Sequence, residues 1–175
     1  MTQRQPLIED ILKQYRSDLN IDYDKYRNHV YRVFNFTLLL CDVEARDIDT
    51  LAVAAAFHDI GIWTTGTMDY LEPSAKLAGE YIKAKRPKVA AKTVEQIILN
   101  HHKITTYKNN TLVEAFRKAD LVDLSLGIIS HGISHREILD IYHQFPEENF
   151  HVFIMKEVAL HSLKNPFKPL PIFKW

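Results

Sequence analysis

The chain of 175 residues contains one cysteine, Cys41, so no disulfide can form within it. No apolar run reaches membrane-spanning length, and the first thirty residues do not have the pattern of a secretory signal peptide. These absences predict a cytoplasmic protein in a reducing compartment, without a membrane partner. Net charge is also absent, because 22 lysines and arginines balance 22 aspartates and glutamates. A molecule without a net field does not attract a polyanion, so we expect no nucleic-acid partner and a small ligand instead.

The composition is that of a soluble globular protein, with 46% apolar and 25% charged residues. A chain of this length can bury enough surface for one apolar core to stabilise the fold. We therefore expect a single domain over 1–175. Its core should cover about 20–130, and further helices and a proline-rich tail should occupy 131–175.

The spacing of apolar residues is helical. Over 22–42 they recur three and four positions apart, which lines one helix face, whereas a half-buried strand would alternate. The same reading predicts an all-α bundle without strands, with helices near 6–18, 22–42, 47–60, 73–86, 88–102, 111–127, 134–144 and 150–163. Local signals agree at several ends: Pro73 suits a first helical turn, Ser134 and Glu137 form a capping-box pattern, and Gly61 can close the helix that ends near Asp59. The segment 51–57 is apolar all round, which predicts a central helix.

A pair of metal-binding side chains, His58 and Asp59, stands where this central helix ends. Consecutive residues of a regular helix point about 100° apart, so one ion takes both most easily where the backbone turns. His29 lies on the preceding helix and Asp120 on a later one, each among apolar residues. Two imidazoles and two carboxylates form a mixed site for one divalent ion, and Mn, Fe, Co, Ni, Zn and Mg are all admissible.

These residues carry a family resemblance. The order His29, then His58-Asp59 within Ala-Ala-Phe-His-Asp-Ile-Gly, then Asp120 within Arg-Lys-Ala-Asp resembles the HD superfamily over about 20–130. The resemblance implies an all-helical core, a divalent metal ion on these four residues and, usually, phosphoester hydrolysis. In relatives with two metals, a histidine at the position of His101 completes a second site together with an earlier histidine. This sequence has no histidine between 59 and 100, so we expect one tightly held ion.

We assign catalysis to Asp59, Glu72, Arg32 and His101. Glu72 stands near the place of the missing histidine, and three roles stay open for it: metal ligand, general acid, or a charge at a helix N-terminus. Arg32 lies three residues after His29 on the same helix face and is expected to direct its guanidinium at an oxygen anion held by the metal; a solvated charge is the alternative. His101 follows the core positions of its helix and should point inward.

The first functional hypothesis is a metal-dependent phosphohydrolase that acts on a small phosphoester, such as a nucleotide. An HD-type di-iron oxygenase is the second, and the missing histidine counts against it. The third is a non-catalytic, metal-stabilised ligand-binding module. A rival metal pair, His131 and His135, has the four-residue spacing of a zinc site on one helix, but Gly132 and the cap at Ser134 argue against a continuous helix. The sequence fixes neither the substrate, nor the metal, nor the oligomeric state.

Overall fold

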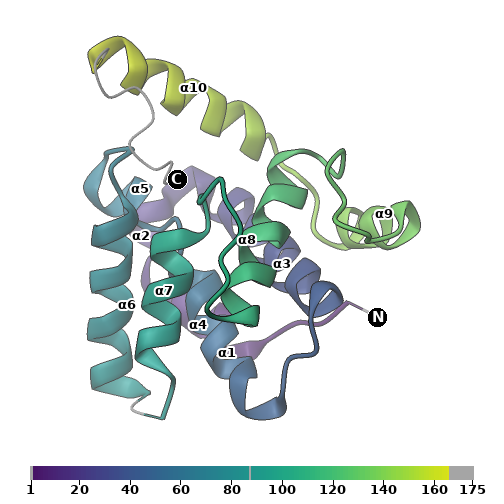
Figure 1. The fold of residues 1–175 in the computed structure, drawn as a ribbon. Coiled ribbons are helices and arrows are strands. Elements are labelled where there is room, and N and C mark those ends of the chain that lie inside the picture. Colours follow the sequence, from purple (N-terminus) through teal and green to yellow (C-terminus); the bar gives the residue numbers. More distant parts are fainter. Residues whose placement is uncertain (1, 87, 166–175) are drawn as a thin grey trace.

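The computed structural model describes residues 2–86 and 88–165, and these residues form helices and turns without a β-strand (Figure 1). This confirms the all-α prediction. In chain order, the elements are α1 (Pro6–Gln14), α2 (Arg16–Leu19), η1 (Asn20–Asp22), α3 (Tyr23–Leu40), η2 (Ala45–Asp47), α4 (Ile48–Phe57), α5 (Gly61–Thr65), α6 (Leu71–Lys85), α7 (Ala91–Asn100), α8 (Thr111–Leu124), α9 (His135–Gln144) and α10 (Phe150–Lys164).

Helix α4 lies at the centre, as its apolar sequence predicts. All eight residues from Thr50 to Phe57 are buried, and the helix packs against α1, α3, α6 and α7. The alanines of this segment present little side-chain volume, which lets the neighbouring helices approach closely. The C-terminal end of α4, where His58 and Asp59 follow, is therefore enclosed on several sides.

Helices α3 and α8 form the most extensive packing pair, and α7 packs against both α4 and α8. Helix α6 runs beside α7 at one end of the bundle (Figure 1). The middle of α3, the ends of α4 and α7, and the C-terminal half of α8 consequently face a common interior. This arrangement brings together segments that are distant in the chain, such as those of His29 and Asp123, which lie 94 residues apart.

The role predicted for Gly61 is wrong. The chain does not stop there but turns at 58–60 and enters the short helix α5, whose first residue is Gly61. A Cβ on Gly61 would lie 2.7 Å from the Tyr70 carbonyl oxygen and 2.8 Å from Ser74 Oγ. The Gly61 N–H donates a hydrogen bond to the same Ser74 hydroxyl at 2.9 Å. Glycine is needed here for the close approach of α5 to α6, and not to end a helix.

Other end signals act as expected. Ser134 and Glu137 form the predicted capping box of α9, and Pro73 lies in the first turn of α6. The helix predicted over 6–18 is interrupted at Tyr15, which separates α1 from α2. Most of the proline-rich tail, from residue 166 on, lies outside the described residues. Among the helices that the structure describes, none is both long and apolar enough to cross a membrane.

Candidate metal centre

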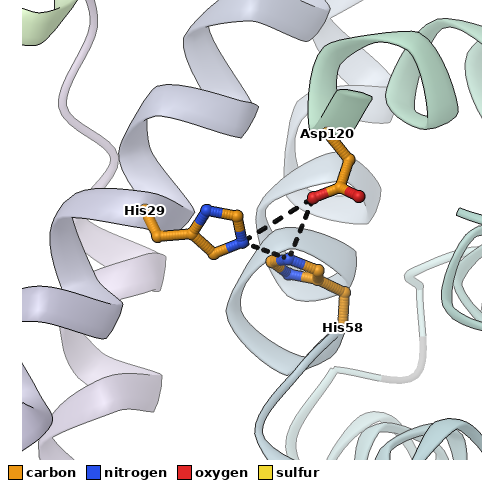
Figure 2. Close-up of side chains that lie close together, drawn as sticks. All are labelled: His29, His58 and Asp120. Atoms are coloured by element: carbon orange, nitrogen blue, oxygen red, sulfur yellow. Dashed lines mark hydrogen bonds and ion pairs between the residues drawn. The ribbon is translucent and has the colours of Figure 1, made fainter. Parts of the chain in front are cut away.

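The structure brings the four predicted metal ligands together in the interior. Figure 2 shows His29 of α3, His58 after α4 and Asp120 of α8 pointing toward one another. The Nε2 atoms of His29 and His58 are 2.9 Å apart. Asp120 Oδ1 lies 3.7 and 3.9 Å from these two nitrogens, and Asp59 Oδ2 lies 3.6 and 3.5 Å from them. None of the four residues is more than 3% exposed.

The donor atoms of this cluster fit a divalent ion. Ligand atoms at about 2.0–2.2 Å from one ion lie roughly 3–3.5 Å apart when they occupy neighbouring coordination positions. The separations above lie close to this range. Asp120 Oδ1 is buried and makes no hydrogen bond, although an unpaired buried acceptor costs about 1–3 kcal/mol. A cation at this position would supply the missing partner.

His29 is held in place by Asp123, a residue that the sequence reasoning did not identify. Asp123 Oδ2 accepts a hydrogen bond from His29 Nδ1 at 2.6 Å, which leaves Nε2 to face the cluster. Tyr142 donates a further hydrogen bond to Asp123 Oδ1 at 2.8 Å. A second carboxylate behind a metal-binding histidine fixes the ring orientation and raises its basicity.

Arg32 does not face a place where an anion could bind the metal. Its side chain is fully buried, and its Nε and Nη2 atoms donate to the two Asp123 oxygens at 2.6 and 3.0 Å. Its Nη1 donates to the carbonyls of Phe145 and Pro146 at 3.1 and 3.0 Å. All three nitrogens are thus engaged within the protein. The structure therefore replaces the predicted anion contact with a buried ion pair that supports Asp123.

His101 points inward, as its helix position predicts: it is 2% exposed, and its Nε2 lies 3.1 Å from Asp59 Oδ1. Glu72 is exposed in the first turn of α6 and borders a surface hollow with Thr64 and Lys76. The structure does not bring Glu72 to the cluster, so only its role as a helix N-terminal charge agrees with this position.

The rival pair does not form. His135 begins α9, whereas His131 precedes it with a positive φ of 50°, and both side chains are exposed. Because the two histidines do not lie on one helix, their side chains do not share the helix face that a zinc site with this spacing requires. Gly132, also at positive φ, interrupts the backbone between them as expected.

Several further residues reach the cluster. His102 Nδ1 lies 3.4 Å from Asp120 Oδ2, Tyr70 OH lies 2.8 Å from His102 Nε2, and the Phe150 ring stacks on His29 with centroids 4.0 Å apart. The matched three-residue spacing of His29 to Arg32 and of Asp120 to Asp123 was a usable signal for the buried ion pair. No comparable signal exists for Tyr70 or Phe150, whose positions depend on the packing of distant helices.

The pKa values of the cluster reflect burial and the charged groups that lie close together in it. Burial and the nearby Asp59 raise the pKa of Asp120 to about 7, although His101 and His29 oppose this. Burial lowers the pKa of His29, but hydrogen bonds to Asp123 and Asp59 outweigh it and raise the value to about 9. Near neutral pH, protons therefore partly occupy the positions where a metal ion would bind.

Comparison with known proteins agrees with the geometry. The family model described as HD domain matches residues 26–131, which is more than half of the chain. The matched part includes the residues of the cluster named above, except Phe150 and Tyr142. No curated protein and no solved structure matched. The chain belongs to the HD domain family.

Proposed function

We propose that this protein is a metal-dependent phosphohydrolase that acts on a small phosphoester, such as a nucleotide. The observation that carries the proposal is the unpartnered Asp120 Oδ1 within a buried set of two histidines and two aspartates, in a family whose members are typically hydrolases of this kind. A divalent ion in this site would activate a water molecule and neutralise charge on the phosphoryl group.

The protein's own residues prepare the site before anything binds. Asp123 orients His29, and the Ala55 carbonyl accepts a hydrogen bond from His58 Nδ1 at 2.7 Å. Both histidines consequently present Nε2 to the same point. Asp59 and Asp120 supply the negative charge that a cation requires. Ligands held in this way lose little freedom on binding, which favours tight and specific coordination.

Aromatic side chains of α10 pack on one side of the cluster. The Phe150 ring stacks on His29, and Phe153 stacks on Trp63 with ring centroids 5.2 Å apart. A dry environment strengthens the interaction between the site and a charged phosphoryl group. Because the four ligands are buried, we expect side chains that cover them to move when a substrate enters.

A second candidate is an HD-type oxygenase with two iron ions. It gains support from His101 and His102, which lie on the other side of Asp59 and Asp120 and enlarge the ligand set. Its ligands would be the same nitrogen and oxygen donors, which suit iron as well as other borderline ions.

The proposal is tested by a hydrolysis screen on purified protein of known metal content. Nucleotides and small phosphate esters are supplied with Mn²⁺, Co²⁺, Ni²⁺ or Mg²⁺, and phosphate release is measured. We expect metal-dependent release that a chelator abolishes and that Asp59→Ala loses, whereas His143→Ala, an exposed position on α9, retains it. Inactivity at full metal occupancy would overturn the hydrolase and favour a binding module. Two irons per chain with dioxygen uptake would favour the oxygenase.

A further inference from the structure

Helix α10 forms an outer layer on the metal cluster. Figure 1 shows it as the outermost helix, running past the end of the bundle where α5 lies. Its first residue, Phe150, stacks on His29 with ring centroids 4.0 Å apart, and Phe153, about one turn later, stacks on Trp63. One ring of α10 thus contacts a predicted metal ligand, and the next contacts α5.

The following turns of α10 cover a second side of the cluster. Ile154 and Val158 pack against a buried apolar group, which consists of Ile62, Met68, Tyr70 and Leu71. Tyr70 is 1% exposed and also reaches the cluster, since its hydroxyl lies 2.8 Å from His102 Nε2. His102 Nδ1 in turn lies 3.4 Å from Asp120 Oδ2. The apolar group therefore stands between α10 and the ligands on this side.

A hollow of about 350 Å³ lies beside the apolar group, between the C-terminal half of α10 and the chain before α6. Leu160 and Lys164 line it from α10, and Ile62 and Met68 line it from the opposite side. A volume of this order holds a small organic ligand. None of the four predicted metal ligands is among the described residues that line the hollow. The hollow is therefore separated from the cluster by the apolar group that α10 covers.

Few side chains attach α10 to the rest of the described chain. Phe150 is the one buried residue among the fifteen of α10, whereas eight of the ten residues of α4 are buried. The outer face of α10 carries exposed apolar residues, such as Val152 and Met155, which are 64% and 72% exposed. An element with few buried apolar contacts opens at a lower cost in free energy than the helices of the core.

The turn that precedes α10 has the features of a hinge. Glu148 and Asn149 have positive φ values of 52° and 62°, which residues other than glycine adopt rarely. Such backbone strain persists where the surrounding contacts impose it, and movement of the helix would relieve it. The Glu147 carboxylate accepts a hydrogen bond from the Asn149 N–H at 2.7 Å. His151 Nε2 lies 2.8 Å from the Asp123 carbonyl oxygen, which anchors the first turn of α10 to α8.

We infer that α10 is a lid over the metal cluster, closed in this structure, which turns about Glu148–Asn149 to admit a small anionic substrate. The first turn stays anchored, and the displacement grows along the helix. Opening therefore lifts Ile154 and Val158 from the apolar group, and the hollow then joins the cluster on the side of Tyr70. Because α10 lies beyond residues 26–131, the lid is not part of the matched family domain. The inference rests on the buried site of the proposed function and not on the reaction.

Thiol labelling measures opening without a metal or a reaction. Met68→Cys, at a position that is 5% exposed, is combined with Cys41→Ser so that it is the single thiol, and its rate of reaction with dithiobis(nitrobenzoate) is followed. We expect Phe153→Ala to raise this rate at least about tenfold, because it removes the aromatic stack on Trp63. Val152→Ala, the exposed neighbour on α10, is the matched control and should change the rate less than about twofold.

Two further measurements separate a lid from general loosening. Val53→Cys, fully buried within α4, should be labelled equally in the Phe153→Ala and Val152→Ala backgrounds. A chelator should extract Mn²⁺ at least about tenfold faster from Phe153→Ala than from Val152→Ala, since the ion leaves through the same opening. Circular dichroism verifies folding, and Phe153→Leu is used if the alanine variant does not fold.

The lid would be overturned by equal labelling of Met68→Cys in the two backgrounds, or by an equal acceleration at Val53→Cys. Faster labelling with unchanged Mn²⁺ extraction would also overturn it, because α10 would then open without exposing the site. A lid refuted in this way, in a protein that hydrolyses phosphoesters, leaves the proposed function standing. A lid supported by labelling and extraction, in a protein that hydrolyses no phosphoester, refutes the hydrolase alone. A chain that binds no Mn²⁺ would refute the metal centre and both proposals.

Discussion

At the scale of single residues, Asp123 links the metal ligands to the rest of the fold. Burial alone would raise its pKa, but Arg32 and His29 outweigh burial and hold the pKa of Asp123 well below its ordinary value. The carboxylate therefore stays ionised, and it balances the guanidinium of Arg32 while it orients His29. One buried charge thus serves both stability and the geometry of the site.

We predict that Arg32→Ala lowers the free energy of unfolding of the metal-free protein by about 3–5 kcal/mol, because it leaves Asp123 charged and buried without its main partner. Urea denaturation measures this change. The control is Arg46→Ala, whose side chain is 77% exposed and pairs with Glu44; we expect a change below about 1 kcal/mol. Equal, small effects of the two substitutions would show that the buried pair does not stabilise the fold.

A second prediction concerns the ligands themselves. His58→Ala or Asp59→Ala should remove the bound ion, since each substitution takes one ligand from a set of four. Elemental analysis after gel filtration gives the metal content per chain, and His143→Ala should keep the wild-type content. If both variants retained the wild-type metal content, the assignment of His58 and Asp59 as metal ligands would be wrong.

The four candidate metal ligands could be identified in the sequence because their residue types, order and helical context are visible in it. For the partner of Arg32, the sequence offers only the matched three-residue spacing of Asp120 and Asp123, which does not by itself decide the pairing. A charged residue among apolar ones is either paired or exposed, and only the packing of α3 on α8 decides this by placing Asp123 opposite. The sequence could not decide whether His102 reaches the cluster beside His101, for a related reason. Two consecutive residues reach one centre only if the helix ends between or before them, and helix ends are the least certain part of a sequence-based assignment.

At the scale of elements, α4 and α7 end in the same way. The last carbonyls of a helix lack partners within it, and Nδ1 of the histidine that follows donates to the carbonyl three residues earlier, Ala55 for His58 and Ile98 for His101. Each helix thereby satisfies one of its own terminal groups and fixes the ring of a metal-binding residue. The long, periodic helices could be predicted from the sequence, whereas α5 could not, because five residues are too few to show a helical period.

The contact between α5 and α6 gives a third prediction. Gly61→Ala should lower the free energy of unfolding by about 1–3 kcal/mol, because the new Cβ would lie 2.7 Å from the Tyr70 carbonyl oxygen, a backbone atom that cannot move freely. Thermal denaturation measures the effect.

Gly79→Ala is the matched control for this substitution. Gly79 lies within α6, and a Cβ there meets no atom within 4 Å, so the change should be neutral or stabilising by up to about 1 kcal/mol through helix propensity. If Gly61→Ala behaved like Gly79→Ala, the close approach of α5 to α6 would not require glycine.

At the scale of the whole molecule, the cluster lies where α3, α8 and the ends of α4 and α7 meet. An ion there would connect four segments that are distant in the chain, and by mass action it would stabilise the folded state by about 2.7 kcal/mol at one hundred times its Kd. The family match covers these four helices, whereas α10, which places Phe150 over His29, lies beyond it. Binding of an ion there would thus be coupled to the folding of the shared core.

This coupling should depend on pH with a definite sign. Burial lowers the pKa of His29, but Asp123 and Asp59 outweigh burial and raise the pKa to about 9. The bound proton therefore stabilises the metal-free fold, and this contribution is fully present below about pH 6.5, the ordinary pKa of histidine. That contribution is lost as the pH rises through about 9. The pKa of Asp120, raised by burial to about 7, acts in the same direction at lower pH. An ion must displace both protons, since it takes the same lone pairs.

We therefore predict that the affinity for Mn²⁺ rises about tenfold per pH unit between pH 7 and 9, because one proton on His29 competes with the ion there. Below pH 7, where Asp120 also holds a proton, the affinity should rise by up to about a hundredfold per pH unit. The increase in Tm on adding a fixed excess of Mn²⁺ should likewise be larger at pH 8 than at pH 6. Chelator competition at pH 6, 7 and 8 measures the affinity. Calorimetry in buffers of different ionisation enthalpy counts the protons, and we expect between one and two to be released at pH 7. An affinity that stays constant from pH 6 to 8, with no proton release, would show that His29 and Asp120 do not bind the ion.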